Sequence, residues 1–218
     1  MKLVVIGGTS GMGRATVAAA RELGWDVVSA GRRGDAFVDV THPASVEALF
    51  EQVGPLDHLL VTASPGRPGP LLEQTPDEAR TFLDGKLFGA WLAARYAVPR
   101  MSPGGSITFI TGVAVVRPPR AASTVVAAFA GVEALTRALA LELGPIRVNT
   151  IRPGYTDTEM WGEDRTELRA KVAQGLPTGR IGEPEDVADA ALFLMRNPQV
   201  TGAVLEVSGG ESLVEALT

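Results

Sequence analysis

The sequence Gly7-Gly8-Thr9-Ser10-Gly11-Met12-Gly13 lies between an apolar run and a helical pattern. The run Leu3–Ile6 predicts a buried parallel strand, and Met12–Leu23 predicts a helix that ends at Gly24. Glycines at such a strand-to-helix turn let the backbone approach a pyrophosphate and let the helix pack close to the strand. The free N–H groups at the start of the helix then face the phosphates. The turn therefore predicts a dinucleotide site, with a tight turn that binds no ligand as the alternative.

Outward from this turn, short apolar runs alternate with longer helical patterns to the end of the chain. The further predicted strands are Asp26–Ala30, Asp57–Thr62, Ser106–Thr111, Ile146–Ile151 and Ala203–Val207. The further predicted helices are Pro43–Val53, a helix from the capping box of Thr75 and Glu78 to about Val98, Ala122–Leu143, Glu163–Gln174 and Asp186–Met195, and Ser64–Pro70 is a predicted loop. With no break in composition over residues 1–218, the alternation predicts a single α/β domain with a Rossmann-like, doubly wound parallel sheet.

The interval after the second predicted strand is unusually short. Only Gly34–Val38 lie between Arg33 and Asp39, whereas a crossover between parallel strands needs roughly 10–12 residues including its helix. We therefore expect the helix after the second strand to be missing. The third strand, at Phe37–Val40, is expected to be short, irregular or absent.

Composition excludes several classes of protein. The 218 residues include no cysteine and only two histidines, His42 and His58, so we expect no thiol nucleophile, no disulfide and no metal site. The net charge is −5 and the basic residues are dispersed, which argues against nucleic-acid binding. The longest uncharged run, Met101–Val116, is too short and too polar for a membrane helix, and no signal-peptide pattern is found. We expect a cytoplasmic protein that acts on a small-molecule substrate, with no membrane or nucleic-acid partner.

Two arginines follow the second predicted strand, in Gly31-Arg32-Arg33. A site for NAD usually has a carboxylate here, which binds the ribose 2′-hydroxyl and would repel a 2′-phosphate. Two guanidinium groups would instead bind that phosphate, so the segment favours NADP(H) as the cofactor. The alternative is that both arginines are solvated loop residues. We expect Asp39, a few residues later, to meet the adenine edge.

These motifs resemble those of the short-chain dehydrogenase/reductase family, and the resemblance extends over nearly the whole chain. The spacing Gly7-x-x-x-Gly11-x-Gly13 matches the family's nucleotide turn, and Asp39-Val40-Thr41 resembles its adenine contact. The segments Leu139–Asn149 and Pro153–Thr158 resemble the stretch around its sixth strand, and Gly179–Pro184 with Thr201–Gly210 resembles its C-terminal signature. The resemblance implies a Rossmann-like fold, a nicotinamide dinucleotide, and a homodimer or homotetramer that pairs the helices at Thr75–Val98 and Ala122–Leu143.

The turn, the arginines and the resemblance together predict one set of cofactor-binding residues. These are Gly7, Thr9, Ser10, Gly11, Met12, Gly13, Arg32, Arg33, Asp39, Val40, Ala63, Ser64, Pro153, Gly154, Thr156 and Thr158.

The chain departs from the family at its catalytic group of Asn, Ser, Tyr and Lys. In the family, the Tyr protonates the substrate oxygen, and the Lys lowers the pKa of that Tyr and holds the ribose. The Tyr position falls on Val125, the Lys position on Phe129, the Ser position on Gly112 and the Asn position on Lys86, and the family's Asn-Asn-Ala-Gly is replaced by Val61-Thr62-Ala63-Ser64. Because positions 125 and 129 share a helix face, we expect an apolar wall beside the nicotinamide.

Three functions remain open. The first is an NADPH-dependent reductase of a small carbonyl or imine, in which Lys86 is the relocated acid, Thr111 orients the substrate oxygen and Tyr155 is a second possible proton donor. The structural alternatives for Lys86 are that its stem lies along apolar surface with the amine in solvent, or that it pairs with Asp84 or another carboxylate. The alternatives for the other two are a satisfied hydroxyl at Thr111 and a packing role for Tyr155. In the second function no acid is needed, because hydride transfer to an iminium carbon creates no oxyanion. The third is a non-catalytic NADPH-binding sensor or assembly subunit.

Overall fold

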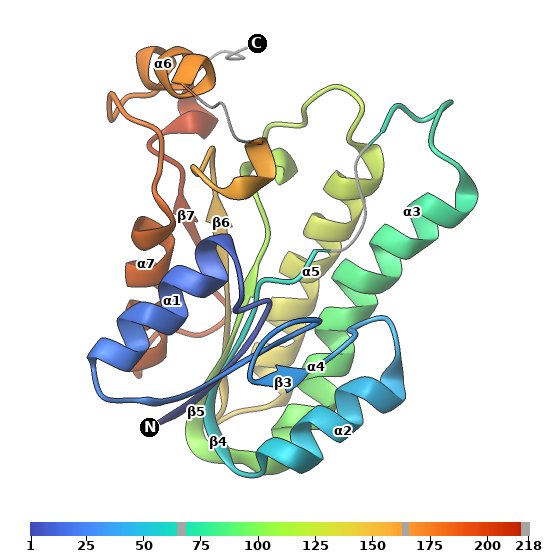
Figure 1. Cartoon of the computed structure of the whole chain (residues 1–218), viewed down its shortest axis with the longest axis vertical. Helices are drawn as coiled ribbons and strands as arrows, with labels where there is room; N and C mark the ends of the chain where they lie inside the picture. The colour runs from blue at the N-terminus through green and yellow to red at the C-terminus, as the bar shows by residue number, and fades with distance from the viewer. Residues whose placement is uncertain (65–68, 163–165, 215–218) are drawn as a thin grey trace.

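The computed structural model describes residues 1–64, 69–162 and 166–214, and its strands form one parallel sheet (Figure 1). The strands are β1 (Lys2–Ile6), β2 (Asp26–Gly31), β3 (Ala36–Phe37), β4 (Leu56–Val61), β5 (Met101–Ile110), β6 (Arg147–Pro153) and β7 (Val204–Val207). Their order is β3-β2-β1-β4-β5-β6-β7, so the winding reverses between β1 and β4. The predicted doubly wound α/β fold is confirmed.

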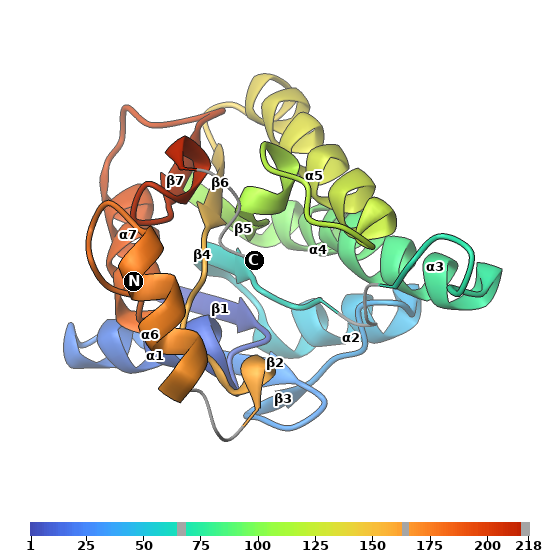
Figure 2. The same cartoon turned by 90° about the horizontal axis from the view of Figure 1, so that it is seen from above.

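Helices cover both faces of this sheet (Figure 2). α1 (Gly11–Glu22) and α7 (Pro184–Arg196) pack on one face, and α2 (Pro43–Val53), α4 (Gly89–Ala97) and α5 (Ser123–Glu142) pack on the other. α6 (Thr166–Gly175) stands apart from both layers at the top of Figure 1.

The core divides between the two faces because successive side chains of a buried strand point in opposite directions. In β1, Val4 and Ile6 join the apolar cluster under α2, α4 and α5, whereas Leu3 and Val5 join the cluster under α1 and α7. All four side chains are buried, which explains why this strand reads as a continuous apolar run.

The connection from β2 to β3 consists of residues 32–35 and contains no helix. β3 nevertheless pairs in parallel with β2, over two residues. This is possible because the loop folds back on β2: Asp35 N–H donates to Ser29 O (2.8 Å) and Val38 N–H donates to Gly31 O (3.0 Å). Gly34 has φ +153°, and a Cβ there would lie 2.6 Å from Ser29 O, so a glycine is needed at the bend.

The predicted helix from Thr75 to Val98 is interrupted. Its capping box forms as predicted, with Glu78 N–H donating to Thr75 Oγ1 and Thr75 N–H donating to the Glu78 carboxylate. The chain then runs through α3 (Pro76–Leu83), a π-helical turn η1 (Asp84–Phe88) and α4. Such turns insert one extra residue and are frequent at functional sites. Sequence periodicity did not indicate this turn, which contains Lys86.

Other predicted elements differ from the observed ones mainly at their ends. β5 begins at Met101 rather than Ser106, and α7 begins at Pro184 rather than Asp186. The first part of the predicted helix Glu163–Gln174 lies outside the described residues, and α6 begins at Thr166. Residues 65–68 of the predicted loop Ser64–Pro70 also lie outside them.

α5 is the one helix of the described chain that is long and apolar enough, by length and composition alone, to cross a membrane. In the fold it packs on the sheet beside β6 and buries Ala128, Val132 and Leu139. Other apolar residues of the helix are exposed, among them Ala127 and Leu141.

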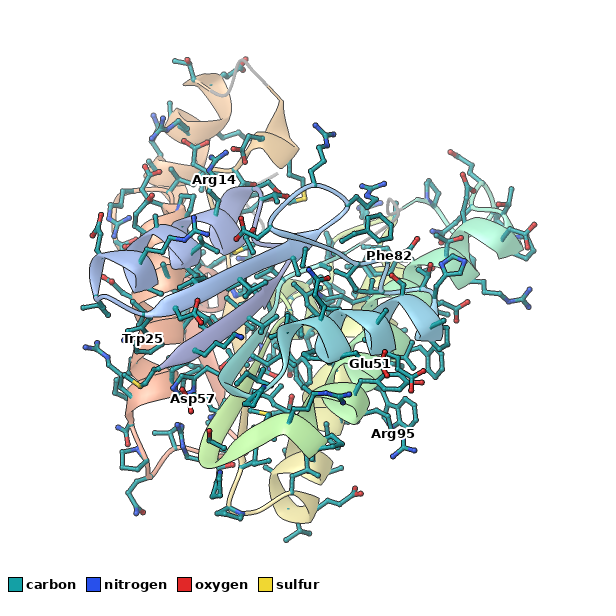
Figure 3. All side chains as sticks on the ribbon, turned by 60° about the horizontal axis from the view of Figure 1, so that its bottom comes forward. Arg14, Trp25, Glu51, Asp57, Phe82 and Arg95 are labelled. Atoms are coloured by element: carbon teal, nitrogen blue, oxygen red, sulfur yellow. The ribbon has the colours of Figure 1, made fainter. Side chains whose placement is uncertain are left out.

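His58 on β4 is a buried titratable group in this fold. Its ring stacks on Trp25 (labelled in Figure 3) with 5.3 Å between centroids, and its Nδ1 lies 2.9 Å from Ser106 Oγ. Burial lowers the pKa of His58 to about 4, against the nearby charge of Asp57, which raises it. The folded protein therefore holds this imidazole neutral.

We predict that His58 makes the protein less stable in mild acid. In the unfolded chain its pKa is near 6.5, so its contribution is complete above that pH and declines as pH falls toward 4. Between pH 7.5 and pH 5 this amounts to about 2 kcal/mol of the free energy of unfolding. Urea unfolding at both pH values measures it: the decline should shrink in His58→Asn and persist in the matched control His42→Asn. An equal decline in wild type and His58→Asn would contradict this assignment.

Candidate functional site

The glycine turn lies at the carboxyl end of β1, where the strand order reverses and β1 pairs with both β2 and β4. Ligands of open α/β sheets bind at such reversal points. The turn is packed without side chains: a Cβ on Gly13 would lie 2.2 Å from Gly7 O, and one on Gly7 would lie 2.3 Å from Thr62 Oγ1. α1 therefore begins directly against the end of β1.

The start of α1 fits a phosphate group. Ser10 occupies the N-cap position, but its side chain makes no capping hydrogen bond. The first N–H groups of the helix are thus not capped by their own N-cap residue, and the helix dipole places partial positive charge there. Met12 follows Gly11 within this first turn.

The arginine loop lies beside this turn. A Cβ on Gly34 would lie 3.1 Å from Thr9 Cγ2, and a Cβ on Gly31 would lie 3.9 Å from Thr9 Oγ1. The fold therefore brings Thr9 next to the loop that carries Arg32 and Arg33. Both arginines are exposed, and neither has an ion-pair partner within the part of the chain that the structure describes.

Asp39 and Val40 follow β3, the strand that pairs with β2. The Asp39 carboxylate accepts hydrogen bonds from Thr41 Oγ1 (2.7 Å) and Thr41 N–H (2.9 Å), and these bonds hold the pKa of Asp39 below its usual range. Val40 is buried against Gly89, whose Cβ would lie 3.1 Å from Val40 Cβ. Asp39 is thus oriented by its own loop, and Val40 is fixed by α4.

The remaining predicted cofactor-binding residues follow β4 and β6. Ala63 and Ser64 come directly after β4, and Pro153 ends β6. Gly154 N–H donates to Val207 O, and Thr156 Oγ1 donates to Gly154 O within its own loop. Thr158 reaches the glycine turn: its Cγ2 lies 3.2 Å from the position of a Cβ on Gly11.

Lys86 is carried into the interior by the π-helical turn. Its side chain is buried, and its Nζ donates a hydrogen bond to Ala63 O (3.3 Å) at the end of β4. Burial lowers the pKa of Lys86 to about 7. The ion pair with Asp84, considered as an alternative above, is not among the ion pairs of the described residues.

Phe129 forms the apolar wall beside this amine. Lys86 Nζ lies 5.3 Å from the centroid of the Phe129 ring, and Phe82 lies 6.3 Å from it, centroid to centroid. A Cβ on Gly112 would lie 2.9 Å from Phe129 Cε2, so the ring covers the carboxyl end of β5. Any larger residue at position 112 would displace the ring. The sequence indicated Phe129 as part of this wall but did not indicate Phe82, because the place of Phe82 depends on the packing of α3 against α5.

Thr111 and Tyr155 are placed differently from Lys86. Thr111 Oγ1 donates toward Glu133 Oε1 (3.2 Å) and Ile151 O (3.3 Å), and Glu133 in turn pairs with Arg152. Tyr155 packs against the small apolar cluster around α6, and burial raises the pKa of its phenol. The structure therefore brings Lys86 to Ala63, while Thr111 belongs to a buried ion network and Tyr155 to a packing cluster.

Comparisons with known proteins agree with this architecture. A family model described as Enoyl-(Acyl carrier protein) reductase matches residues 7–212. Short-chain dehydrogenase/reductase ATR9 of Stachybotrys chlorohalonatus is 39% identical over an alignment of length 181, which covers 77% of this chain and 70% of that protein. Carbonyl reductase family member 4 of Danio rerio is 32% identical over an alignment of length 234, which covers 97% of this chain and 98% of that protein.

A solved structure shows the same fold. The crystal structure of a small-chain dehydrogenase in complex with NADPH has a TM-score of 0.87 and 35% sequence identity to this chain, and it covers 98% of this chain and 99% of its own. The phosphate turn, the strand order and the matches along the sequence lead to one conclusion. The chain belongs to the short-chain dehydrogenase/reductase family.

Proposed function

We propose that this protein is an NADP(H)-dependent oxidoreductase that transfers a hydride between the cofactor and a small carbonyl or imine substrate, with Lys86 as the proton donor. The observation that carries the proposal is the buried amine of Lys86, which is bonded to Ala63 O beside the carboxyl end of β4. The cytoplasm is the proposed location.

The cofactor proposal rests on the glycine turn and the arginine loop. The start of α1, which the Ser10 side chain does not cap, can hold the pyrophosphate, and Arg32 and Arg33, beside Thr9, can bind a 2′-phosphate. The NADPH complex of a similar protein supports this choice. When bound, the reduced nicotinamide supplies the hydride.

Lys86 has the properties that a relocated acid requires. With a pKa of about 7, roughly half of the amine is protonated at neutral pH. In carbonyl reduction, the proton passes from Nζ to the substrate oxygen as the hydride adds to the carbon, and the amine then regains a proton from solvent. Phe129 and Phe82 keep water from this amine, which strengthens its interaction with a developing negative charge.

Reduction of an iminium substrate is the second enzymatic possibility, and the same wall supports it. An iminium carbon accepts a hydride without forming an oxyanion, so no proton donor is needed. The faces of Phe129 and Phe82 would stabilise such a cation. Under this alternative, Lys86 would have to be neutral, because its ammonium would repel the substrate.

One observation favours a non-catalytic NADPH-binding protein. The Phe129 ring covers the end of β5 at Gly112, where the family resemblance places a catalytic serine. A sensor or assembly subunit has no need for substrate space at this point. Its signature would be cofactor binding with no turnover of any carbonyl or imine.

We further propose a homodimer or homotetramer built on α4 and α5. An apolar groove on the outer side of these helices is lined by Leu83, Asp84, Leu87, Phe88, Trp91 and Leu135. Phe88 and Trp91 are 44% and 41% exposed and stack on each other, 5.7 Å apart. A second copy of the chain would cover these rings together with the exposed apolar surface of α5.

The first prediction of this proposal concerns cofactor choice. We expect NADPH to bind about tenfold or more tightly than NADH, because two guanidinium groups meet the 2′-phosphate. Replacing both residues, Arg32→Ala with Arg33→Ala, should weaken NADPH binding and leave NADH binding nearly unchanged, as isothermal titration calorimetry would measure. Arg137→Ala, an exposed arginine on α5, is the matched control. Equal affinity of the wild type for the two cofactors would refute the choice of NADP(H).

The second prediction concerns Lys86. We expect Lys86→Met to leave NADPH affinity within about threefold and to lower turnover of a carbonyl substrate by about 100-fold, the range for lost acid catalysis. Because the protonated amine is the active form, wild-type kcat should fall as pH rises through about 7. Lys171→Met, an exposed lysine on α6, is the control. Full turnover in Lys86→Met would show that the acid is elsewhere or unnecessary and would favour the iminium alternative, and lost folding or lost NADPH binding would make Lys86 a structural residue.

The third prediction concerns assembly. Trp91→Glu places a charge on the exposed ring stack and should convert the assembly to monomers at micromolar concentration, measured by light scattering. The control is Leu23→Glu, which changes an exposed leucine at the end of α1, on the opposite face of the sheet, and should leave the assembly intact. A monomeric wild type would rule the interface out.

A further inference from the structure

The phosphate turn already holds an anion that belongs to the chain itself. Glu159 Oε2 accepts a hydrogen bond from Gly11 N–H at 3.2 Å, and the same carboxylate pairs with Arg14. Glu159 lies 148 residues along the chain from Gly11, in the segment between β6 and α6. Arg14 is labelled in Figure 3, where it lies on α1 beside that segment.

The Glu159 carboxylate lies at the N-terminus of α1, where positive charge is concentrated. Gly11 is the first residue of the helix, Ser10 does not cap it, and Arg14 adds a full charge within the first turn. Glu159's own backbone N–H, the Arg14 guanidinium and the Gly11 N–H hold the pKa of Glu159 below its usual range. The carboxylate is therefore ionised at neutral pH.

Thr158, the residue before Glu159, also lies against the turn. Thr158 Cγ2 lies 3.2 Å from the position of a Cβ on Gly11, and Gly11 has φ +46°. Two residues predicted to bind the cofactor thus lie against each other. The ion pair is accessible to solvent, with Arg14 61% and Glu159 51% exposed, so it contributes little to stability and is easily exchanged.

We propose that Glu159 is an internal substitute for the cofactor pyrophosphate, which holds the Thr158–Glu159 segment on the turn and is exchanged for the phosphates when the dinucleotide binds. The inference rests on the proposed binding of NADP(H). The Glu159 carboxylate and a pyrophosphate would both accept hydrogen bonds from the first N–H groups of α1. Because both are negatively charged, they would repel each other at this shared position. Exchange therefore frees Arg14, which becomes a further phosphate-binding residue, and it releases Thr158 and Glu159 from the turn.

Removing the charge of Glu159 tests the proposal. Glu159→Gln keeps the side-chain shape and should bind NADPH roughly fivefold more tightly than the wild type, as followed by NADPH fluorescence. The binding of 2′-AMP, which carries the 2′-phosphate and no pyrophosphate, should be unchanged. Glu185→Gln, at an exposed position on α7, is the matched control and should leave both affinities unchanged. Arg14→Gln should weaken NADPH and leave 2′-AMP unaffected.

The outcomes separate this inference from the function on which it rests. Unchanged or weaker NADPH binding in Glu159→Gln, with 2′-AMP bound normally, would overturn the exchange and make Glu159 a clamp that acts with the cofactor. A gain for 2′-AMP equal to that for NADPH would also overturn it, because the effect would then be a general change of charge. Failure of the wild type to bind either compound would instead refute the NADP(H) site itself.

Discussion

The close contact between α1 and the end of β1 is the constraint on which the rest of the site depends. A Cβ on Gly13 would lie 2.2 Å from Gly7 O, so no side chain can separate the helix from the strand. The contact seats α1 on the sheet, points its first N–H groups at the strand reversal, and places Thr9 against the arginine loop. The anion site, the position of the arginines that we propose bind the 2′-phosphate, and the contact of Glu159 with Gly11 all depend on this close packing.

A second, linked constraint governs the chemistry. Phe129 lies 2.9 Å from where a Cβ on Gly112 would be, so the substitutions at these two positions are not independent. The ring needs the glycine, and together they close the end of β5. The polar group next to that wall is the amine of Lys86, which the π-helical turn places within hydrogen-bond distance of Ala63 O. The departures from the family's catalytic group thus form one packing arrangement, and burial in that arrangement is what brings the pKa of Lys86 to about 7.

Local signals predicted the fold and the phosphate turn, because a strand, a glycine turn and a helix follow one another in the sequence. The absence of a helix between β2 and β3 could likewise be predicted, because the length of the connecting chain alone limits a crossover. Contacts between residues that are distant in the sequence could not be predicted in this way. The π-helical turn at Lys86, the place of Phe82 on the apolar wall and the bond from Gly11 to Glu159 depend on how separate elements pack. The same holds for the ion network around Thr111 and the packing cluster around Tyr155, which join residues that are distant in the sequence.

We propose that this remodelled site still transfers a hydride. The transfer of deuterium from NADPH deuterated at nicotinamide C4 to a panel of carbonyl, enone and imine compounds tests this, with the products analysed by mass spectrometry. We expect deuterium on the former carbonyl or imine carbon of at least one product, at a rate that falls above pH 7 for carbonyls. Tight NADPH binding with no deuterium transferred to any compound would contradict it and identify the protein as a non-catalytic member of its family.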